Sequence, residues 1–224
     1  MDESLAELFD RLAVVGKAFS SARRLALIEL LTQGERTVEA LAAEAGMGLS
    51  TVSAHLQVLK LSHLVRTRRE GTRIHYRLAD DDVVRLYTAM RAVAQEHSPD
   101  VERALASYLG INGLDVPDVD EVSREELVER MRTGEVQVVD VRPTAEYDAG
   151  HLPGALHVPF DELTDHLDAL DPEVEVVAYC RGAWCVMAND AVRLLRAEGR
   201  TARRLEAGMT EWRLAGLPIE EGVA

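Results

Sequence analysis

The sequence predicts a chain of two domains, a mostly α-helical one followed by an α/β one with a parallel sheet. In the first hundred residues, apolar side chains recur at helical spacing and lead into a short, arginine-rich pair of strands. In the last hundred, short apolar runs alternate with helical segments, which is typical of a parallel sheet covered on both faces. Because 224 residues suffice for two domains of about a hundred residues each, we expect domains over residues 1–97 and 122–224, joined by a helical linker over residues 98–121.

The first domain begins with a series of amphipathic helices. Apolar spacing predicts helices over residues 5–15 and 22–31, and a short helix over residues 38–45 that ends at a glycine. Ser50 is a favourable N-cap for the next helix. Its inward stripe consists of Val52, Leu56 and Leu59. Two short helices joined by a glycine-containing turn form a helix-turn-helix, whose second helix enters the major groove of DNA.

A β-hairpin with a turn at Glu70-Gly71 is predicted next, over residues 65–78. The stretch from Ser50 to Arg77 holds six basic residues and one acidic residue, although the whole chain has a formal net charge of −14. A concentrated basic patch of this kind is typical of nucleic-acid contact, and an arginine-rich hairpin beside a recognition helix is a wing that reaches phosphates or the minor groove. The residues expected to contact DNA are Ser50, Thr51, Ser53, His55, Gln57, Lys60, Arg66, Arg68, Arg69 and Arg73.

Three segments of the first domain support a resemblance to a known family. They read ARRLALIELL (22–31), STVSAHLQVLKLSHLV (50–65) and RREGTRIHYRL (68–78). With these segments, residues 5–97 resemble the ArsR/SmtB family of winged-helix repressors. The resemblance implies a homodimer that binds operator DNA and is held together by its first and last helices, here residues 5–15 and 82–96.

The chain departs from the family pattern at positions that contact DNA or sense metals and thiols in other members. Ala54 stands where the family usually has a polar residue, so one contact to a base edge is expected to be missing. The segments that hold metal ligands in many members read VEALAAEAG and DDDVVRLY here, and we therefore expect no metal site. Because no cysteine precedes residue 180, the paired-thiol sensors of some sulfur-responsive members are excluded as well.

The linker and the start of the second domain contain recognisable helix signals. Ser98-Pro99 is suited to begin a short helix, and residues 111–120 indicate an exposed connection. The second domain is expected to start near Val122, where Ser123 and Glu126 form a capping box. Its predicted strands cover residues 136–141, 155–158, 174–179 and 202–205.

One segment, VEVVAYCRGAWCV from Val174 to Val186, is the most informative of the chain. An apolar strand ends just before Cys180, and a helical pattern begins just after Cys185. This is the strand–loop–helix geometry of a parallel sheet, whose strand C-termini form the ligand-binding edge. Backbone N–H groups and the positive end of a helix dipole stabilise an anion there, so the sequence predicts a nucleophilic thiolate at Cys180.

Two flanking segments extend this pattern over about a hundred residues. VQVVDVRPTAEYDAGHLPGALHVP (136–159) precedes the cysteine loop, and RRLEAGMTEWRLAGLPIE (203–220) follows it, in an order and spacing that resemble the rhodanese family. Domains of that family carry sulfane sulfur as a cysteine persulfide, which implies that Cys180 is the nucleophile. The loop implied to cradle the anion consists of Arg181, Gly182, Ala183, Trp184 and Cys185. Ala183 replaces the glycine that the family has three residues after the nucleophile, and Cys185 replaces a frequent arginine.

Each of these residues has a second interpretation. Cys180 is either the nucleophile or an inert buried cysteine, and the flanking segments favour the former. Cys185 either fills the start of the next helix or acts as a resolving thiol that attacks a persulfide or sulfenate on Cys180. Arg181 is interpreted as recruiting anions rather than as a solvated loop charge. Asp140 and Arg142 are interpreted as a buried ion pair that braces the loop, not as catalytic groups.

Composition excludes several classes of protein. No apolar run reaches the length of a membrane span, and the acidic start MDESLAELFD is unlike a signal peptide. The chain has two cysteines, both in one loop, which excludes a secreted disulfide framework and fits a reducing cytoplasm. Their C-x4-C spacing without a nearby histidine is poor for a metal site. We therefore expect a cytoplasmic protein that binds no membrane and needs no metal or other cofactor.

Three functional hypotheses follow. The first is a DNA-binding transcriptional regulator, a repressor by its resemblance, whose second domain senses or carries reactive sulfur as a persulfide on Cys180. Its expected partners are double-stranded operator DNA, a second copy of the chain, and a small sulfur donor such as thiosulfate, a persulfide or a polysulfide. The second hypothesis is a sulfurtransferase tethered to a DNA-binding module. The third treats the second domain as an interaction module, with sensing at the dimer interface. Trp184, which crowds the loop, and Cys185, which offers an internal trap, favour switching over turnover.

Overall fold

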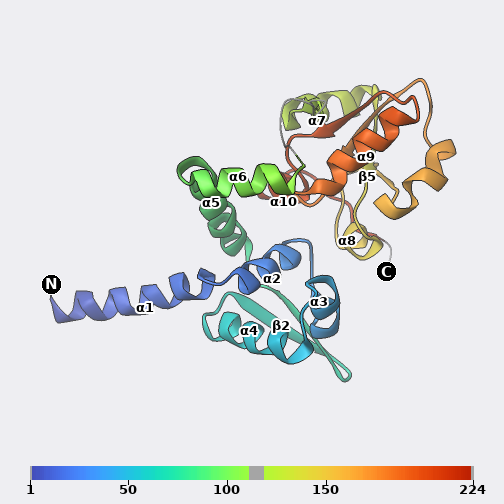
Figure 1. Ribbon diagram of the computed structural model, residues 1–224. Helices are drawn as coiled ribbons and strands as arrows, with labels where there is room; N and C mark the ends of the chain where they lie inside the picture. Colours follow the sequence, from blue (N-terminus) through green and yellow to red (C-terminus); the bar gives the residue numbers. More distant parts are fainter. Residues whose placement is uncertain (1, 111–118, 223–224) are drawn as a thin grey trace. The chain divides into compact units, whose positions relative to one another are not determined.

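The computed structural model describes residues 2–110 and 119–222, which form two compact units, Met1–Thr88 and Ala89–Ala224 (Figure 1). The boundary between the units lies within one helix, α5 (Asp81–His97), so the second half of α5 belongs to the second unit. The domain limits expected at residues 97 and 122 remain predictions. Most of the connection expected over residues 111–120 lies outside the described residues.

The first unit has a helical core. In chain order it contains α1 (Glu3–Phe19), α2 (Ala22–Thr32), β1 (Arg36–Thr37), α3 (Val38–Glu44), α4 (Leu49–Leu61), β2 (Val65–Glu70), β3 (Arg73–Leu78) and the first half of α5. Apolar side chains of α2, α3 and α4 meet in the interior, where each buried aliphatic side chain contributes roughly 1.5–3 kcal/mol. The completely buried ones are Leu27, Ile28, Leu41, Val52, Leu56 and Leu59, which confirms the predicted inward stripe of α4.

The prediction that Ser50 caps α4 is wrong by two residues. The helix begins at Leu49, and Gly48 is its N-cap, with an extended backbone and a carbonyl that accepts the N–H of Val52 at 3.0 Å. A serine cap is worth only about 1 kcal/mol. Burial of the apolar stripe is worth more, so packing sets where this helix starts and leaves Ser50 exposed inside the first turn.

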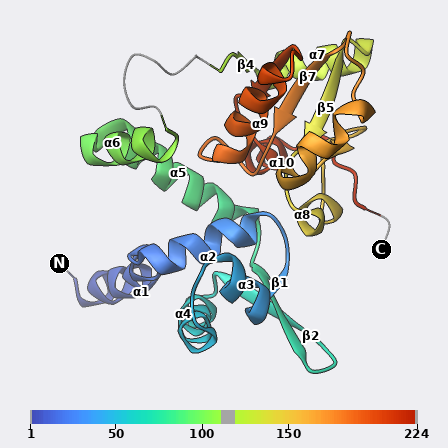
Figure 2. The same ribbon diagram turned by 45° about the vertical axis from the view of Figure 1, so that its right-hand side comes forward.

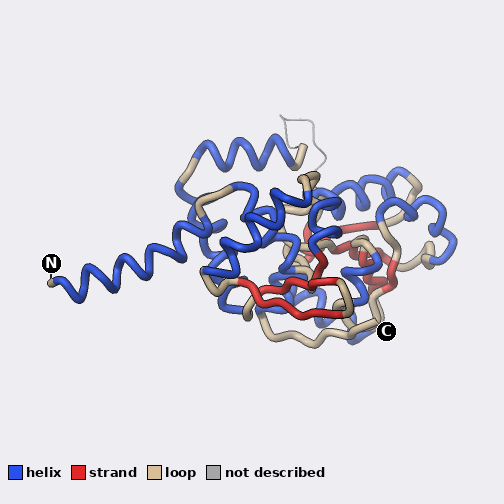
Figure 3. The backbone as a smooth tube through the Cα atoms, turned by 90° about the horizontal axis from the view of Figure 1, so that it is seen from below, coloured by secondary structure: helices blue, strands red, loops and turns tan. Residues whose placement is uncertain are grey.

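The predicted hairpin is confirmed as β2 and β3, which pair antiparallel in full register from Val65 opposite Leu78 to Glu70 opposite Arg73. The turn lies one residue later than the expected Glu70-Gly71, because Glu70 still pairs with Arg73 and leaves Gly71 and Thr72 between the strands. Gly71 has the positive φ of 58° that such a turn favours. Within the described residues, β1 pairs with the other edge of β3 to complete a sheet of three strands, and Figure 3 shows the hairpin coloured as strand.

The second unit is an α/β structure. Beyond α5 it contains α6 (Pro99–Tyr108), β4 (Glu121–Val122), α7 (Arg124–Thr133), β5 (Val136–Asp140), α8 (Thr144–Asp148), β6 (Leu156–His157), the 3-10 helix η1 (Phe160–Ala169), β7 (Glu175–Tyr179), α9 (Val186–Ala197), β8 (Ala202–Leu205) and α10 (Met209–Leu214). The described strands form one sheet in the order β4-β8-β7-β5-β6, with every pairing parallel. The four predicted strands are therefore confirmed, with β7 at the centre.

The serine caps of two helices in this unit are confirmed, whereas the expected capping box of Ser123 and Glu126 is only half formed. Ser98 is the N-cap of α6 and Pro99 its first residue, as predicted. The Ser123 hydroxyl caps α7 by accepting the N–H of Glu126 at 3.1 Å. The carboxylate of Glu126 does not return to the N-cap as a capping box requires; it bonds Arg203 at 2.7 Å.

The two faces of the sheet carry separate hydrophobic cores. Alternate residues of a strand point to opposite faces, so Ala178 and Cys180 face one core while Val177 and Tyr179 face the other. The core that contains Cys180 is closed by α9 and η1, and the core that contains Tyr179 is closed by α7 and α10 (Figure 2). The C-terminal end of β7 thus places Cys180 at the edge of a buried layer.

Candidate functional site

Tyr179, the last residue of β7, holds the strand end from which the cysteine loop leaves. Its side chain is completely buried, and its hydroxyl donates to Asp140 and accepts the backbone N–H of Leu152 at 3.1 Å. Burial, together with the nearby Asp140 carboxylate, raises the pKa of Tyr179 well above its usual value. The residue before Cys180 is therefore fixed by side-chain hydrogen bonds as well as by the sheet.

Asp140 and Arg142 form the buried ion pair expected at the end of the neighbouring strand β5. Both side chains are completely buried, with Arg142 Nε 2.9 Å from Asp140 Oδ1 and Nη2 2.6 Å from Oδ2. Arg142 Nη2 also donates to the carbonyl of Gly150 at 2.8 Å. Asp140 also accepts a hydrogen bond from the Tyr179 hydroxyl. The ion pair therefore links the end of β5 to the end of β7, where the cysteine loop begins.

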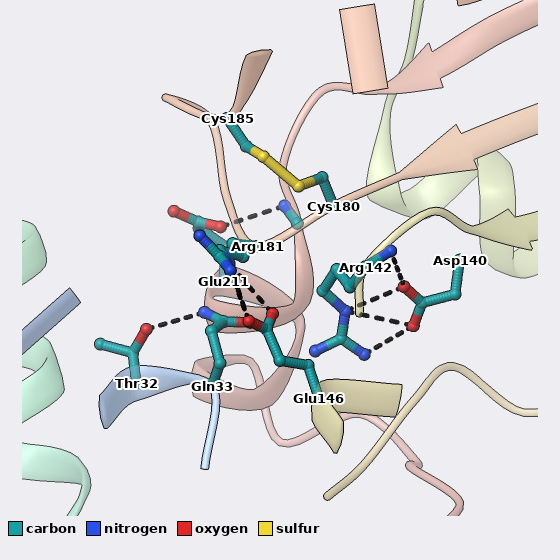
Figure 4. Close-up of a disulfide and its surroundings, with 10 residues drawn as sticks. Thr32, Gln33, Asp140, Arg142, Glu146, Cys180, Arg181, Cys185 and Glu211 are labelled. Atoms are coloured by element: carbon teal, nitrogen blue, oxygen red, sulfur yellow. Dashed lines mark hydrogen bonds and ion pairs between the residues drawn. A yellow bond between two sulfur atoms is a disulfide. The ribbon is translucent and has the colours of Figure 1, made fainter. Parts of the chain in front are cut away.

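The loop itself is closed by a disulfide between Cys180 and Cys185, with Sγ atoms 2.06 Å apart and Cα atoms 6.2 Å apart (Figure 4). Cys180 is 2% exposed, and Cys185 is half-buried. Cys185 is the N-cap of α9, so the sulfur pair lies at the N-terminus of a 12-residue helix. A thiolate released there by reduction would be stabilised by the helix dipole.

The other side of the loop is held by the N-terminus of α10. The N–H groups of Met209 and Thr210 donate to the carbonyls of Cys180 and Arg181 at 2.9 and 3.0 Å. The close approach requires a glycine at position 208, because a Cβ there would lie 2.4 Å from the nitrogen of Gly182. Sequence reasoning assigned no role to Gly208, although an isolated glycine just before a helical segment is the signal for such an approach.

Arg181 does not take the position expected of an anion-recruiting residue. Its Nε lies 3.0 Å from both carboxylate oxygens of Glu146 and its Nη2 lies 2.6 Å from Oε1, and Glu146 is 0% exposed (Figure 4). A bidentate pair with a buried carboxylate neutralises the guanidinium charge. Sequence reasoning missed Glu146, because an acidic residue in a short helix carries no signal of its burial.

The remaining loop residues, Gly182, Ala183 and Trp184, lie between the two cysteines in the sequence. Gly182 is buried, and a Cβ at this position would come within 3.0 Å of the carboxylate of Glu211. Ala183 and Trp184 are half-buried. Cys180 itself is 2% exposed while the disulfide is closed.

The predicted DNA-contacting residues of α4 divide into two groups. Ser50, Gln57 and Lys60 are exposed, whereas Thr51, Ser53 and His55 are half-buried. Burial, with further contributions from the nearby Arg24 and Arg23, lowers the pKa of His55, so its imidazole is neutral at pH 7. Helices α2 and α3 pack against α4, and contact of the six side chains with DNA stays a prediction.

The arginines of the wing lie on both faces of the hairpin, because side chains alternate along each strand. Arg66, Arg68 and Arg73 share one face of the hairpin, and Arg69 lies on the other face opposite Ile74. Arg66 stands directly opposite Arg77, and like charges in that relation destabilise a sheet unless an anion neutralises them. Arg68 is already paired with Glu35 and Glu70, at 2.7 Å in each case.

Residues 2–110 and 119–222 contain no group of three or more His, Cys, Asp or Glu side chains that could hold a metal ion. None of the helices described there is both long and apolar enough to cross a membrane.

Comparison with known proteins finds a separate match for each half of the chain. The family model described as bacterial regulatory protein, arsR family, matches residues 21–67, and the rhodanese-like domain model matches residues 123–215. The HTH-type transcriptional regulator Rv0324 of Mycobacterium tuberculosis is 54% identical over 217 residues, covering 97% of this chain and 93% of the relative. A sulfurtransferase of Allochromatium vinosum is 31% identical over 102 residues, covering 45% of this chain and 94% of the relative. Among solved structures, the chain is similar to a homodimeric winged helix-turn-helix DNA-binding domain from Mycobacterium bovis, determined in solution by NMR. The two are 50% identical over 45% of this chain and 93% of the solved chain, with a TM-score of 0.42.

Proposed function

The chain belongs to the arsR family of bacterial regulatory proteins and is a transcriptional regulator with a rhodanese-like domain, and we propose that reactive sulfur at Cys180 controls its binding to operator DNA. The observation that carries the proposal is the pairing of Cys180 with Cys185 at the end of the central strand, on the same chain as a winged helix-turn-helix. The switch has two covalent states, an open dithiol and a closed disulfide.

The first chemical step is sulfur transfer to Cys180. In the dithiol form, the Cys180 thiolate attacks the outer sulfur of a hydropersulfide, R–S–SH, and releases the thiolate R–S⁻. The product is Cys180–S–SH, at the N-terminus of α9 where negative charge is stabilised. No metal or other cofactor takes part, because the donor itself supplies the oxidising equivalents.

The second step closes the loop. The Cys185 thiolate attacks Sγ of Cys180, hydrosulfide leaves, and the Cys180–Cys185 disulfide forms. In sum, one hydropersulfide and two thiols give one thiol, one molecule of hydrogen sulfide and one disulfide. A thiol reductant returns the protein to the dithiol, so the switch resets in a reducing cytoplasm.

The ion pair of Arg181 with Glu146 limits the kinds of sulfur donor that we expect to react with Cys180. Recognition of a dianion such as thiosulfate is strongest where a cation is available to it, and here Glu146 already pairs with the guanidinium. We therefore favour hydropersulfides and protonated polysulfides, which carry little charge and need no cationic clamp.

The DNA-binding state is proposed to be a homodimer that represses transcription. Helix α1 exposes an apolar row whose side chains are 41–63% exposed in the single chain: Leu5, Leu8, Phe9 and Leu12. Exposed apolar rows of this size mark protein interfaces, and a twofold dimer would cover both copies. The exposed Arg66 and Arg73 of each wing then face the two halves of an operator.

A second candidate function, sulfur transfer by a tethered enzyme, is favoured by the 31% identity to a sulfurtransferase over one half of the chain. Turnover requires that the Cys180 persulfide survive until an acceptor arrives. Cys185 lies within bonding distance and competes for that persulfide, which favours switching.

Mass spectrometry of the reduced full-length protein after hydropersulfide treatment tests the chemistry. We expect the wild type to form the disulfide and release one molecule of hydrogen sulfide per chain, Cys185→Ser to stop at the Cys180 persulfide, and Cys180→Ser to do neither. Repeated turnover with a small thiol acceptor, without disulfide formation, would instead establish the sulfurtransferase. If Cys180→Ser responded like the wild type, the sulfur chemistry would lie elsewhere.

A further inference from the structure

We propose that Trp184 reports the state of the two cysteines to helix α5, by docking its indole on Arg91 and Gln95 when the disulfide is closed. This inference rests on the proposed function, because it concerns how the closed and open loops differ. All of the residues involved belong to the second unit, which begins at Ala89.

The contact between Trp184 and α5 is specific in both its polar and its aromatic part. The indole Nε1–H donates to Gln95 Oε1 at 3.0 Å, and the Arg91 guanidinium carbon lies 4.2 Å from the ring centroid. Tryptophan is the aromatic residue that binds cations best, and its one N–H donor requires a correctly placed acceptor. Arg91 and Gln95 are four residues apart and so lie next to each other on one side of α5.

The position of Trp184 in the chain connects this contact to the cysteines. Trp184 directly precedes Cys185 and lies inside the loop that the disulfide closes. In the closed loop, Cys185 is held to Cys180 at the end of β7, so the backbone of Trp184 has few conformations left. Docking the indole then costs little further entropy. In the open dithiol the loop is released, so docking the indole must order more of the chain and costs more conformational entropy.

A contact that is stronger in one covalent state must favour that state. Because the effect of one equilibrium on another is reciprocal, docking of Trp184 on α5 stabilises the disulfide relative to the dithiol. Helix α5 runs without interruption from Asp81 to His97, so the residues that bind the indole share a helix with residues of the first unit. The state of the loop therefore acts on the helix that joins the two units.

The redox equilibrium of the full-length protein measures this coupling without any DNA. Each protein is equilibrated in a glutathione redox buffer, where the disulfide and two glutathione thiols exchange with the dithiol and glutathione disulfide. The thiols are then alkylated and counted by mass spectrometry. Gln95→Ala is expected to shift the equilibrium constant about fivefold toward the dithiol, which is the size of one hydrogen bond, and Trp184→Ala about tenfold, since it also removes the cation–π contact.

Glu96→Ala is the matched control, since Glu96 is an exposed neighbour on the same helix, and it is expected to leave the equilibrium unchanged. Alanine favours helix formation, so Gln95→Ala preserves α5 even if Trp184→Ala were to disturb the loop. Equilibrium constants within twofold of the wild type for both Gln95→Ala and Trp184→Ala would overturn the inference. Failure of the proposed function would give a different result. Gln95→Ala would still shift the redox equilibrium, but the affinity of the protein for DNA would be the same in the disulfide and dithiol forms.

Discussion

Arg181 and Glu146 form a bidentate ion pair in which the carboxylate is completely buried, directly beside the disulfide-bonded Cys180. The pair joins the cysteine loop to helix α8, an element far from it in sequence. An arginine next to a nucleophile would ordinarily be assigned to substrate binding. Here its contacts indicate that it anchors the loop.

Glu146→Gln should destabilise the protein strongly. Removing one partner of a buried ion pair leaves a charge without full compensation, which costs about 3–5 kcal/mol of the free energy of unfolding. Glu129→Gln is the control, because its pair with Arg132 is exposed and should contribute less than about 0.5 kcal/mol. Urea unfolding of both variants measures the difference. Equal, small losses in the two variants would show that Arg181 is not an anchor.

Stability at high pH should depend on Tyr179. Burial and the Asp140 carboxylate raise the pKa of Tyr179 in the folded protein above its unfolded value of 10.0. The unfolded chain therefore loses this proton first, and the free energy of unfolding falls by up to about 1.4 kcal/mol per pH unit above about pH 10. Below that pH the contribution is fully present. Tyr179→Phe lacks this dependence, although it loses about 1–2 kcal/mol at neutral pH with the hydroxyl's hydrogen bonds.

Urea titrations of wild type and Tyr179→Phe near pH 8 and pH 11 provide the measurement. The stability advantage of the wild type should shrink as the pH rises. Tyr76 and Tyr147, whose pKa values are also raised by burial, are present in both proteins and cancel in the comparison. A constant difference between the two pH values would contradict the assigned contacts.

The wing should bind DNA through Arg66 and Arg73 more than through Arg68. Each arginine that neutralises a phosphate adds about 0.9 to the slope of log affinity against log salt concentration. Arg66→Ala and Arg73→Ala should each lower that slope by about one and weaken binding to all sequences similarly. Arg68→Ala should have a smaller effect, because Glu35 and Glu70 already neutralise this side chain. A larger effect of Arg68→Ala than of the other two variants would show that its pairs with Glu35 and Glu70 do not keep this side chain from binding phosphate.

Features encoded by local pattern could be predicted from the sequence. The hairpin, the Ser98 and Ser123 caps and the four strands over residues 136–141, 155–158, 174–179 and 202–205 depend on turn chemistry, hydroxyl caps and apolar runs, which neighbouring residues determine. The strand β4 was missed because two residues give no periodic signal.

Long-range pairings could not be predicted in the same way. Glu146 meets Arg181 across 35 positions and Gln95 meets Trp184 across 89, and no local pattern specifies such partners. The half-buried state of His55 depends likewise on the packing of other helices against α4. The position of Cys180 just after a strand could be predicted from the sequence, whereas the anchoring of its loop depends on partners that only the folded chain brings together.

The most direct test of the account is the affinity of the full-length protein for a duplex from the region upstream of its own gene. Fluorescence anisotropy is measured at one fixed salt concentration, because phosphate contacts make affinity salt-dependent. Dithiol and hydropersulfide-treated samples of wild type and Cys180→Ser are compared, with the covalent state of each checked by mass. We expect treatment to change the affinity of the wild type by about tenfold, within the usual range for coupled sites, and to leave Cys180→Ser unchanged. An unchanged affinity in wild-type protein fully converted to the Cys180–Cys185 disulfide would contradict it.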